Sequence, residues 1–172
     1  MKVIFDYFFS LLGVILLSPM IVLISVLIKI TSKGPIFYTQ RRVGRFGKLF
    51  VILKFRTMYH RHRDNNTITI QGDERITNLG HILRKYKLDE LPSLINILKG
   101  EMSFVGPRPD VPGYADKLKG DSTKILELKP GITSYASIKY ANEENILALQ
   151  EDPIKYNNEI IYPDKVKLNM YY

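Results

Sequence analysis

The sequence predicts an α+β protein that is mainly helical, with an N-terminal membrane helix joined to a small domain that contains short strands. Three features predict this fold. A long uncharged run lies near the start of the chain. Residues 34–58 alternate aromatic or β-branched side chains with basic ones, and residues 77–98 have the apolar spacing of amphipathic helices. The 172 residues are 45% hydrophobic and 24% charged, which excludes wholesale disorder and allows one modest domain core.

The uncharged run from Tyr7 to Ile28 is long enough to cross a membrane. As one helix it would extend about 33 Å, against a hydrocarbon core of about 30 Å. A cleaved signal peptide is the competing interpretation. Asp6 would lie in its n-region, however, the run is too long, and no small-residue cleavage site follows. We therefore predict a retained membrane segment.

Ser18 and Pro19 lie in the middle of this run and predict a bend. Proline removes a backbone donor and clashes with the preceding turn, while the serine hydroxyl can satisfy a freed carbonyl. Lys2 precedes the run and Lys29 and Lys33 follow it, so the positive-inside rule does not separate its two ends. A kinked span and a bent helix that re-enters its own leaflet both stay open, and the residues alone favour the span.

The net charge of +8 is concentrated in one block. Residues 29–63 contain ten Lys and Arg and no acid, whereas residues 64–172 contain 14 basic and 16 acidic residues. Such a block can grip nucleic acid, lie on anionic lipid or form a phosphate-binding cleft, and its position after a membrane helix favours the last two. Lys54 and Arg56 flank Phe55 in an apolar context, which makes them candidate phosphate ligands.

With no cysteine and three histidines, neither a disulfide framework nor a thiolate metal site is expected.

The remaining secondary-structure elements can be predicted in chain order. Turn-forming glycines, apolar spacing and prolines predict strands around Gly44 and Gly47, a polar loop over 60–75, helices over 77–87 and 89–98, an irregular segment over 107–113, a short helix over 114–128, a turn at 129–131 and a helix over 142–150.

Asp89 and Glu90 are the strongest chemical candidates. As the N-cap of helix 89–98, Asp89 would meet free amide donors and the positive end of the helix dipole, which keep a carboxylate ionised. The plain alternative is a structural cap followed by a first-turn acid. Arg84, Lys85 and Lys87 precede the pair, however, and such a cluster suits a phosphate ester and a divalent cation.

A proline-framed arginine is the second candidate. In Pro107-Arg108-Pro109 the two prolines restrain the backbone, so the loop presents one guanidinium at low entropic cost. A rigid connector or a docking segment is the structural alternative.

Five segments in this order form a larger pattern: Ser18-Pro19 in a membrane helix, GPIFYTQRRVG at 34–44, KFRTM at 54–58, LRKYKLDELPSLINILKGEMSFVGPRP at 83–109 and KPGIT at 129–133. This pattern resembles the bacterial sugar transferases, the monotopic phosphoglycosyl transferases that initiate glycoconjugate assembly. The resemblance implies a re-entrant helix over residues 1–30, broken at Ser18-Pro19, and a cytoplasmic catalytic domain over 31–172 on the inner membrane. It favours re-entry over the span.

The resemblance also implies a reaction. A sugar 1-phosphate would pass from a UDP-sugar to polyprenyl (undecaprenyl) phosphate through a covalent aspartyl phosphosugar, with release of UMP. Asp89 would be the nucleophile, Glu90 would support it, and both would hold Mg²⁺. Lys54, Arg56 and Arg84 would bind substrate phosphate and Pro107-Arg108-Pro109 the nucleotide. No nucleic-acid partner is expected, and a homodimer stays open.

The chain departs from the family pattern after Thr133. Ser134 to Ser137 replace the usual Gly-aromatic-Ala-Gln, Lys139 is the nearest substitute for a missing arginine, and Asn169 stands where an aspartate is common. The chain is also expected to end before the family's usual C-terminus. A catalytically weakened relative that acts as a membrane-bound partner, and a membrane-anchored basic module that binds lipid or nucleic acid, therefore stay as alternatives to the enzyme.

Overall fold

The computed structural model of the protein describes residues 1–60 and 72–171. It is mainly helical with short strands, as predicted. The elements are α1 (Lys2–Thr31), β1 (Phe37–Val43), η1 (Arg45–Gly47), β2 (Leu49–Phe55), α2 (Asn78–Lys85), η2 (Leu88–Ser93), α3 (Leu94–Leu98), β3 (Ser103–Val105), η3 (Ala115–Lys117), η4 (Gly120–Glu127), β4 (Gly131–Thr133), α4 (Tyr135–Lys139), α5 (Glu143–Ala148), α6 (Pro153–Tyr156), η5 (Asn157–Ile161) and α7 (Tyr162–Met170). The η elements are 3-10 helices, except η5, which is a π-helical turn.

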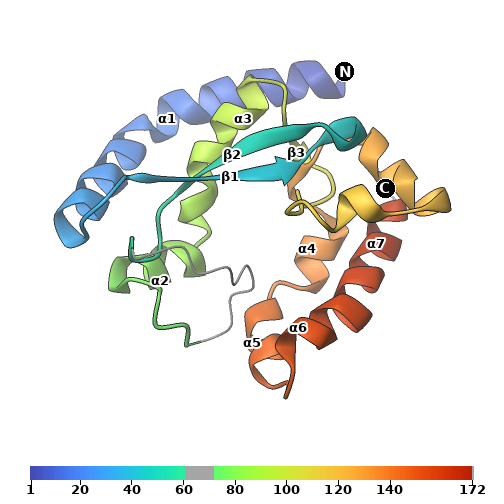
Figure 1. The fold of residues 1–172 in the computed structure, drawn as a ribbon. Coiled ribbons are helices and arrows are strands. Elements are labelled where there is room, and N and C mark those ends of the chain that lie inside the picture. The colour runs from blue at the N-terminus through green and yellow to red at the C-terminus, as the bar shows by residue number, and fades with distance from the viewer. Residues whose placement is uncertain (61–71, 172) are drawn as a thin grey trace.

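Helix α1 is long and apolar enough to cross a membrane. It continues through Pro19 without interruption, so the structure does not show the predicted break at Ser18-Pro19. Figure 1 shows the helix curving over the rest of the molecule. Proline 19 cannot donate to the carbonyl of Ile15, and the Ser18 hydroxyl donates to that carbonyl instead, at 2.8 Å. The predicted role of the serine is thus confirmed.

One face of α1 packs on the remainder of the chain along its whole length. Near its start, Asp6 and Ser10 are buried, and near its end Ile24 and Ile28 are buried. Its other side chains are largely exposed. The apolar contacts fall into two clusters: Phe50, Ile52, Leu94, Ile97 and Met102 with Val14 and Leu17 of α1, and Phe55, Leu83, Ile24 and Ile28 with Leu88 and Leu91.

The predicted strands around Gly44 and Gly47 form an antiparallel hairpin, β1–β2, with register from Phe37↔Phe55 to Val43↔Leu49. The Asn96 side chain of α3 pairs with β2: its oxygen accepts from the Leu53 amide at 3.0 Å, and its nitrogen donates to the Val51 carbonyl at 2.7 Å. This fully buried amide fixes α3, and with it η2, against the hairpin.

Two glycines allow the Pro107 loop and the segment after Pro130 to cross. Strand β3 pairs in parallel with β4, through Ser103↔Gly131 and Val105↔Thr133. A Cβ on Gly106 would overlap the Lys129 carbonyl, and one on Gly131 would overlap the backbone of Gly106. Only glycine fits at both points. The predicted turn at 129–131 therefore ends one residue earlier, because Gly131 belongs to β4.

The predicted helices are partly confirmed. Helix α2 begins after Thr77, whose hydroxyl accepts from the Gly80 amide at 2.9 Å, and α5 lies inside the predicted 142–150. The predicted helix 114–128 is wrong in type, because this stretch forms two 3-10 helices. Most of the predicted polar loop, residues 61–71, lies outside the described residues.

Candidate active site

The turn that carries Asp89 and Glu90 differs from the predicted N-cap. Lys87, not Asp89, precedes the helical turn, and it adopts a left-handed backbone conformation with φ 55°. Asp89 and Glu90 then lie in the first turn of the 3-10 helix η2, and the α-helix begins only at Leu94. The predicted single helix 89–98 is wrong because the tight turn at Lys87 and buried Pro92 favour 3-10 geometry at its start.

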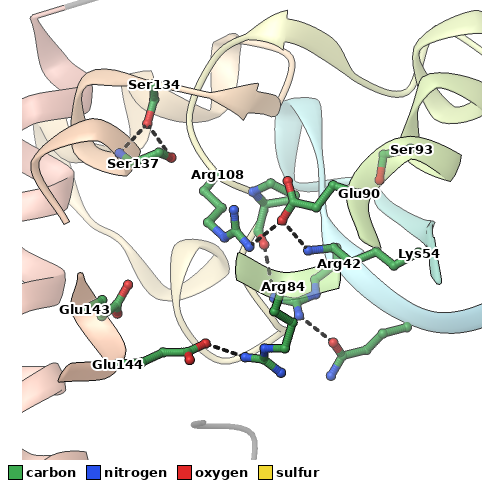
Figure 2. Close-up of polar contacts among 12 residues, drawn as sticks. Arg42, Lys54, Arg84, Glu90, Ser93, Arg108, Ser134, Ser137, Glu143 and Glu144 are labelled. Atoms are coloured by element: carbon green, nitrogen blue, oxygen red, sulfur yellow. Dashed lines mark hydrogen bonds and ion pairs between the residues drawn. The ribbon is translucent and has the colours of Figure 1, made fainter. Parts of the chain in front are cut away.

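Glu90 lies between two cations that come from separate segments of the chain (Figure 2). Its Oε1 accepts from Lys54 Nζ at 2.7 Å and from Arg108 Nη2 at 2.8 Å. Burial by itself raises the pKa of a carboxyl, but Arg108 and Lys54 outweigh it and lower the pKa of Glu90 to about 2. Burial and the neighbouring Arg108 lower the pKa of Lys54 to about 8, against the attraction of Glu90. At neutral pH all three groups are charged.

Asp89 differs from Glu90 because one of its buried carboxylate oxygens makes no hydrogen bond in the described part of the chain. Its Oδ1 is buried and has no hydrogen-bond partner among the residues that the structure describes. Burial raises the pKa of Asp89, against the attraction of Lys54. A poorly solvated carboxylate without a donor keeps its lone pairs available, so Asp89 is suited to nucleophilic attack once it is ionised.

The Pro107-Arg108-Pro109 loop is fixed by hydrogen bonds to its backbone carbonyls from both sides. Arg42 Nη1 donates to the Pro109 carbonyl at 3.1 Å, and the Gly131 amide donates to the Pro107 carbonyl at 2.8 Å. The frame is therefore rigid while the Arg108 side chain stays 44% exposed. This arrangement holds a guanidinium ready for an anionic ligand.

A cavity of about 940 Å³ opens beside these groups. Glu90, Arg84 and the Pro107–Pro109 loop line one part of it, and α5 and α7 line another. Asp89 is not among its lining residues, although its neighbour Glu90 is. The volume is within the range of small-ligand sites.

The predicted phosphate ligands do not all meet. Lys54 and Arg108 share Glu90, whereas Arg84 lines the cavity with its guanidinium paired to Glu144 of α5 (Figure 2).

Arg56 is not brought to the cavity. Buried in the α1–β1 junction, it donates to the carbonyls of Lys33 at 2.5 Å and Ser32 at 2.9 Å. Ser18 and Pro19 are exposed on α1 and are likewise not among the cavity-lining residues of the described chain.

Several polar residues of the cavity were not singled out from the sequence: Asp110, Glu143, Glu144, Tyr162 and Lys165. Nor was Arg42, which lines a small separate pocket beside Glu90 and Lys54. Arg42 lies within the recognised segment 34–44 and Asp110 directly follows the segment 83–109, so their positions carried a usable signal. The others come from α5 and α7, and no local sequence pattern indicates that these helices line the cavity. Lys139, the substitute for a missing arginine, instead pairs with Asp164 at 2.6 Å on the surface.

The carboxylates of Asp89 and Glu90, together with substrate phosphates, form a ligand set that suits a divalent cation. No group of three or more His, Cys, Asp or Glu that could hold a metal forms within residues 1–60 and 72–171. Mg²⁺, however, is commonly held by one or two carboxylates plus substrate phosphates. The buried, unpartnered Oδ1 of Asp89 beside Glu90 offers such oxygens.

The chain is similar to an exopolysaccharide production protein and to undecaprenyl-phosphate sugar-phosphate transferases. It is 38% identical to the exopolysaccharide production protein ExoY of Sinorhizobium fredii, over 81% of this chain and 69% of that protein. It is 34% identical to the UDP-glucose:undecaprenyl-phosphate glucose-1-phosphate transferase of Escherichia coli, over 91% of this chain and 35% of that protein. It is 35% identical to the UDP-N-acetylgalactosamine-undecaprenyl-phosphate N-acetylgalactosaminephosphotransferase of Aeromonas hydrophila, over 77% of this chain and 32% of that protein.

The family comparison covers more than these pairwise matches. The bacterial sugar transferase family matches residues 1–172, which includes α1, the Asp89-Glu90 turn and the Arg108 loop. The family inferred from the sequence is confirmed: this chain belongs to the bacterial sugar transferases.

Proposed function

We propose that this protein transfers a sugar 1-phosphate from a UDP-sugar to undecaprenyl phosphate, with Asp89 as the covalent nucleophile and UMP as the first product. The relatives named above support the substrate classes, since their names state UDP-sugars and undecaprenyl phosphate. Family membership supports the reaction class.

The observation that carries the proposal is the arrangement around Glu90. One carboxylate oxygen holds Lys54 and Arg108 together, next to a second carboxylate, Asp89, whose buried oxygen is unpartnered. A diphosphate needs cations before a carboxylate can approach it, because two anions otherwise repel each other. Lys54 and Arg108 supply this screening, and Glu90 fixes their positions.

The chemistry then runs in two displacements. The Asp89 carboxylate oxygen attacks the β-phosphorus, an O–P bond forms to Asp89, and the bond between the β-phosphorus and the bridging oxygen breaks. The electron pair leaves with UMP. In the second displacement a phosphate oxygen of the lipid attacks the same phosphorus, the bond to Asp89 breaks, and the carboxylate is restored. Sugar and phosphate end as a polyprenyl diphosphosugar, so neither step needs an oxidant or a reductant.

A magnesium ion held by Asp89 and Glu90 would neutralise charge on the diphosphate. Arg84 would add a further cation once its pairing with Glu144 is exchanged for substrate phosphate. Pro107-Arg108-Pro109 would hold the nucleotide against the rigid crossing at Gly106 and Gly131.

We propose that α1 is re-entrant and that the protein lies on the cytoplasmic face of the inner membrane. Both ends of α1 contact the same compact body: Lys2 Nζ donates to the Val105 carbonyl at 3.0 Å, and Arg56 Nη2 donates to the Ser32 carbonyl at 2.9 Å. A straight helix of 30 residues would be about 45 Å long. Were it to span the bilayer, one of these contacts would have to break.

The experiment follows the first half-reaction on purified full-length protein in detergent. Wild type, Asp89→Asn and the matched exposed control Asp121→Asn are each mixed with UDP-sugar and Mg²⁺ without lipid acceptor, and intact mass and UMP are measured. The proposal expects a phosphosugar adduct and stoichiometric UMP with wild type and Asp121→Asn. It expects neither with Asp89→Asn.

The outcomes separate the alternatives. An adduct on folded Asp89→Asn protein would remove Asp89 from the nucleophile role. UMP that appears only when lipid phosphate is added, without an adduct at any time, would indicate a single displacement. Folded wild type that binds UDP-sugar but never releases UMP would indicate a weakened relative.

A further inference from the structure

The cavity contains a second set of polar groups that the proposed reaction does not use. The set consists of Asp110, Tyr162 and Lys165, and all three residues line the cavity. It lies where the residues that follow the Pro107-Arg108-Pro109 loop meet α7.

Asp110 is the acceptor of this set. Its backbone is fixed, because its carbonyl accepts from the Val43 amide at 2.9 Å. Burial raises the pKa of Asp110 to about 6, against the attraction of Lys165 and Arg42. At neutral pH the group is therefore mainly a carboxylate, which only accepts hydrogen bonds.

Tyr162 is the first donor of this set. Its ring packs edge-on against Tyr114 at 5.1 Å between centroids, and the Tyr114 hydroxyl donates to Asn158 at 2.9 Å, so the position of the ring is fixed. Its buried hydroxyl lies beside the Asp110 carboxylate, and burial together with that carboxylate raises the pKa of Tyr162. Within the described chain the hydroxyl makes no hydrogen bond of good geometry. A buried donor whose contact with Asp110 is poorly aligned gains by donating to a ligand carbonyl.

Lys165 is the second donor, three residues further along α7. Its Nζ donates to both carboxylate oxygens of Glu143, at 2.7 and 2.6 Å. These bonds hold the ammonium at the cavity wall. An ammonium has three N–H donors, so one stays available to a ligand.

We propose that Asp110, Tyr162 and Lys165 form a nucleobase subsite that selects uracil. The imide edge of uracil presents a carbonyl, the N3–H and a second carbonyl, which calls for one acceptor and two donors. Cytosine would present the N3 lone pair to the Asp110 carboxylate, and that contact is repulsive. The inference rests on the proposed function, which supplies a UDP-sugar whose phosphates contact Arg108, two residues from Asp110.

The test measures nucleotide binding and catalysis separately. Calorimetric titration of full-length protein in detergent with UMP and with CMP gives the preference between the bases, and UMP release from UDP-sugar gives activity. Wild type is expected to bind UMP at least about tenfold more tightly than CMP. In Asp110→Asn the amide can donate to the cytosine N3, so the preference should fall by about tenfold or more. Asp121→Asn, an exposed carboxylate outside the cavity lining, should leave it unchanged.

A second variant guards against misfolding. Tyr162→Phe keeps the ring that packs on Tyr114 and removes only the hydroxyl, so UMP affinity should fall about three- to tenfold with the thermal midpoint unchanged or raised. An active enzyme in which folded Asp110→Asn or Tyr162→Phe keeps the full UMP preference and affinity would overturn the subsite and leave the proposed function intact. Wild type that binds UMP and CMP equally would overturn it as well. Absence of both nucleotide binding and UMP release would overturn both proposals.

Discussion

The Nζ of Lys54 on β2 lies 2.7 Å from Oε1 of Glu90 on η2, and the same oxygen accepts from Arg108 at 2.8 Å. A hairpin, a 3-10 turn and a proline-framed loop thus meet at one carboxylate oxygen. Because Glu90 is the only anion bonded to both cations in the described chain, it holds them closer together than their mutual repulsion would allow. The geometry that a diphosphate requires is set before substrate arrives.

Glu90→Gln should lower turnover without abolishing it. Glutamine is nearly isosteric and keeps an oxygen acceptor, but it lacks the charge that holds Lys54 against Arg108. A loss of about 3 to 4 kcal/mol in transition-state stabilisation corresponds to roughly 10² to 10³ in rate. Steady-state UMP release measures it, and the adduct at Asp89 should still form slowly. Complete loss of the adduct in folded Glu90→Gln protein would contradict a supporting role.

The same substitution should change the acid stability of the protein. The folded-state pKa of Glu90 is lowered to about 2 from its usual 4.5, so its stabilising contribution is present above about pH 4.5 and is lost as pH falls towards 2. This contribution amounts to at most about 3 kcal/mol. Denaturant unfolding at pH 7 and at pH 3 should show a steeper loss for wild type than for Glu90→Gln. Equal pH slopes would show that Glu90 is not ionised by its partners.

The alkaline limb of the pH profile should report Lys54. Because the pKa of Lys54 is lowered to about 8, deprotonation above that pH removes a cation from the diphosphate site, and kcat/KM for UDP-sugar should fall. On the acid side, activity should fall through a pKa above that of an ordinary aspartate, since burial raises the pKa of Asp89. Lys54→Arg retains its charge and should move the alkaline limb upward. A limb that stays near pH 8 in Lys54→Arg would assign it to another group.

Local patterns in the sequence were sufficient for the hairpin and for α2, since turn glycines and a Thr77 cap act within a few residues. They misplace the start of the next helix, because Lys87 adopts a left-handed backbone conformation that a lysine in the sequence does not indicate. The position of Arg56 beside Phe55, in an apolar context, predicts a contact with substrate phosphate. In the structure, three oxygens of Ser32 and Lys33 take its guanidinium instead.

The candidate site likewise has a part that local sequence patterns predict and a part that depends on long-range contacts. Asp89, Glu90, Lys54 and Arg108 stand in recognisable segments, and the structure brings the last three into direct contact. The wall formed by α5 and α7 could not be read locally, because the Lys165–Glu143 pair joins residues 22 apart. Such pairs become visible only once tertiary packing is known.

Arg56→Lys should destabilise the protein without weakening substrate binding. Lysine cannot reproduce the forked contacts to Lys33 and Ser32 that join α1 to β1, and a buried charge that loses partners is costly. We expect a lowered thermal midpoint with an unchanged KM for UDP-sugar at a temperature where the variant is folded. A raised KM with an unchanged midpoint would restore Arg56 to the phosphate site.

The topology of α1 can be tested directly because the chain contains no cysteine. Val3 and Lys33 are both exposed and flank the apolar run, so Val3→Cys and Lys33→Cys report the two ends separately. Both should react with a membrane-impermeant maleimide in inside-out vesicles and resist it in intact spheroplasts, since contacts to Val105 and from Arg56 hold both ends on one body. Val3→Cys that reacts from the periplasmic side would establish a span.

Adding Pro19→Ala to the Val3→Cys variant restores a donor to the Ile15 carbonyl and removes the ring clash, which favours a straighter helix. A measurable fraction of Val3→Cys should then become reactive from outside, and no change would show that the topology of α1 does not depend on Pro19.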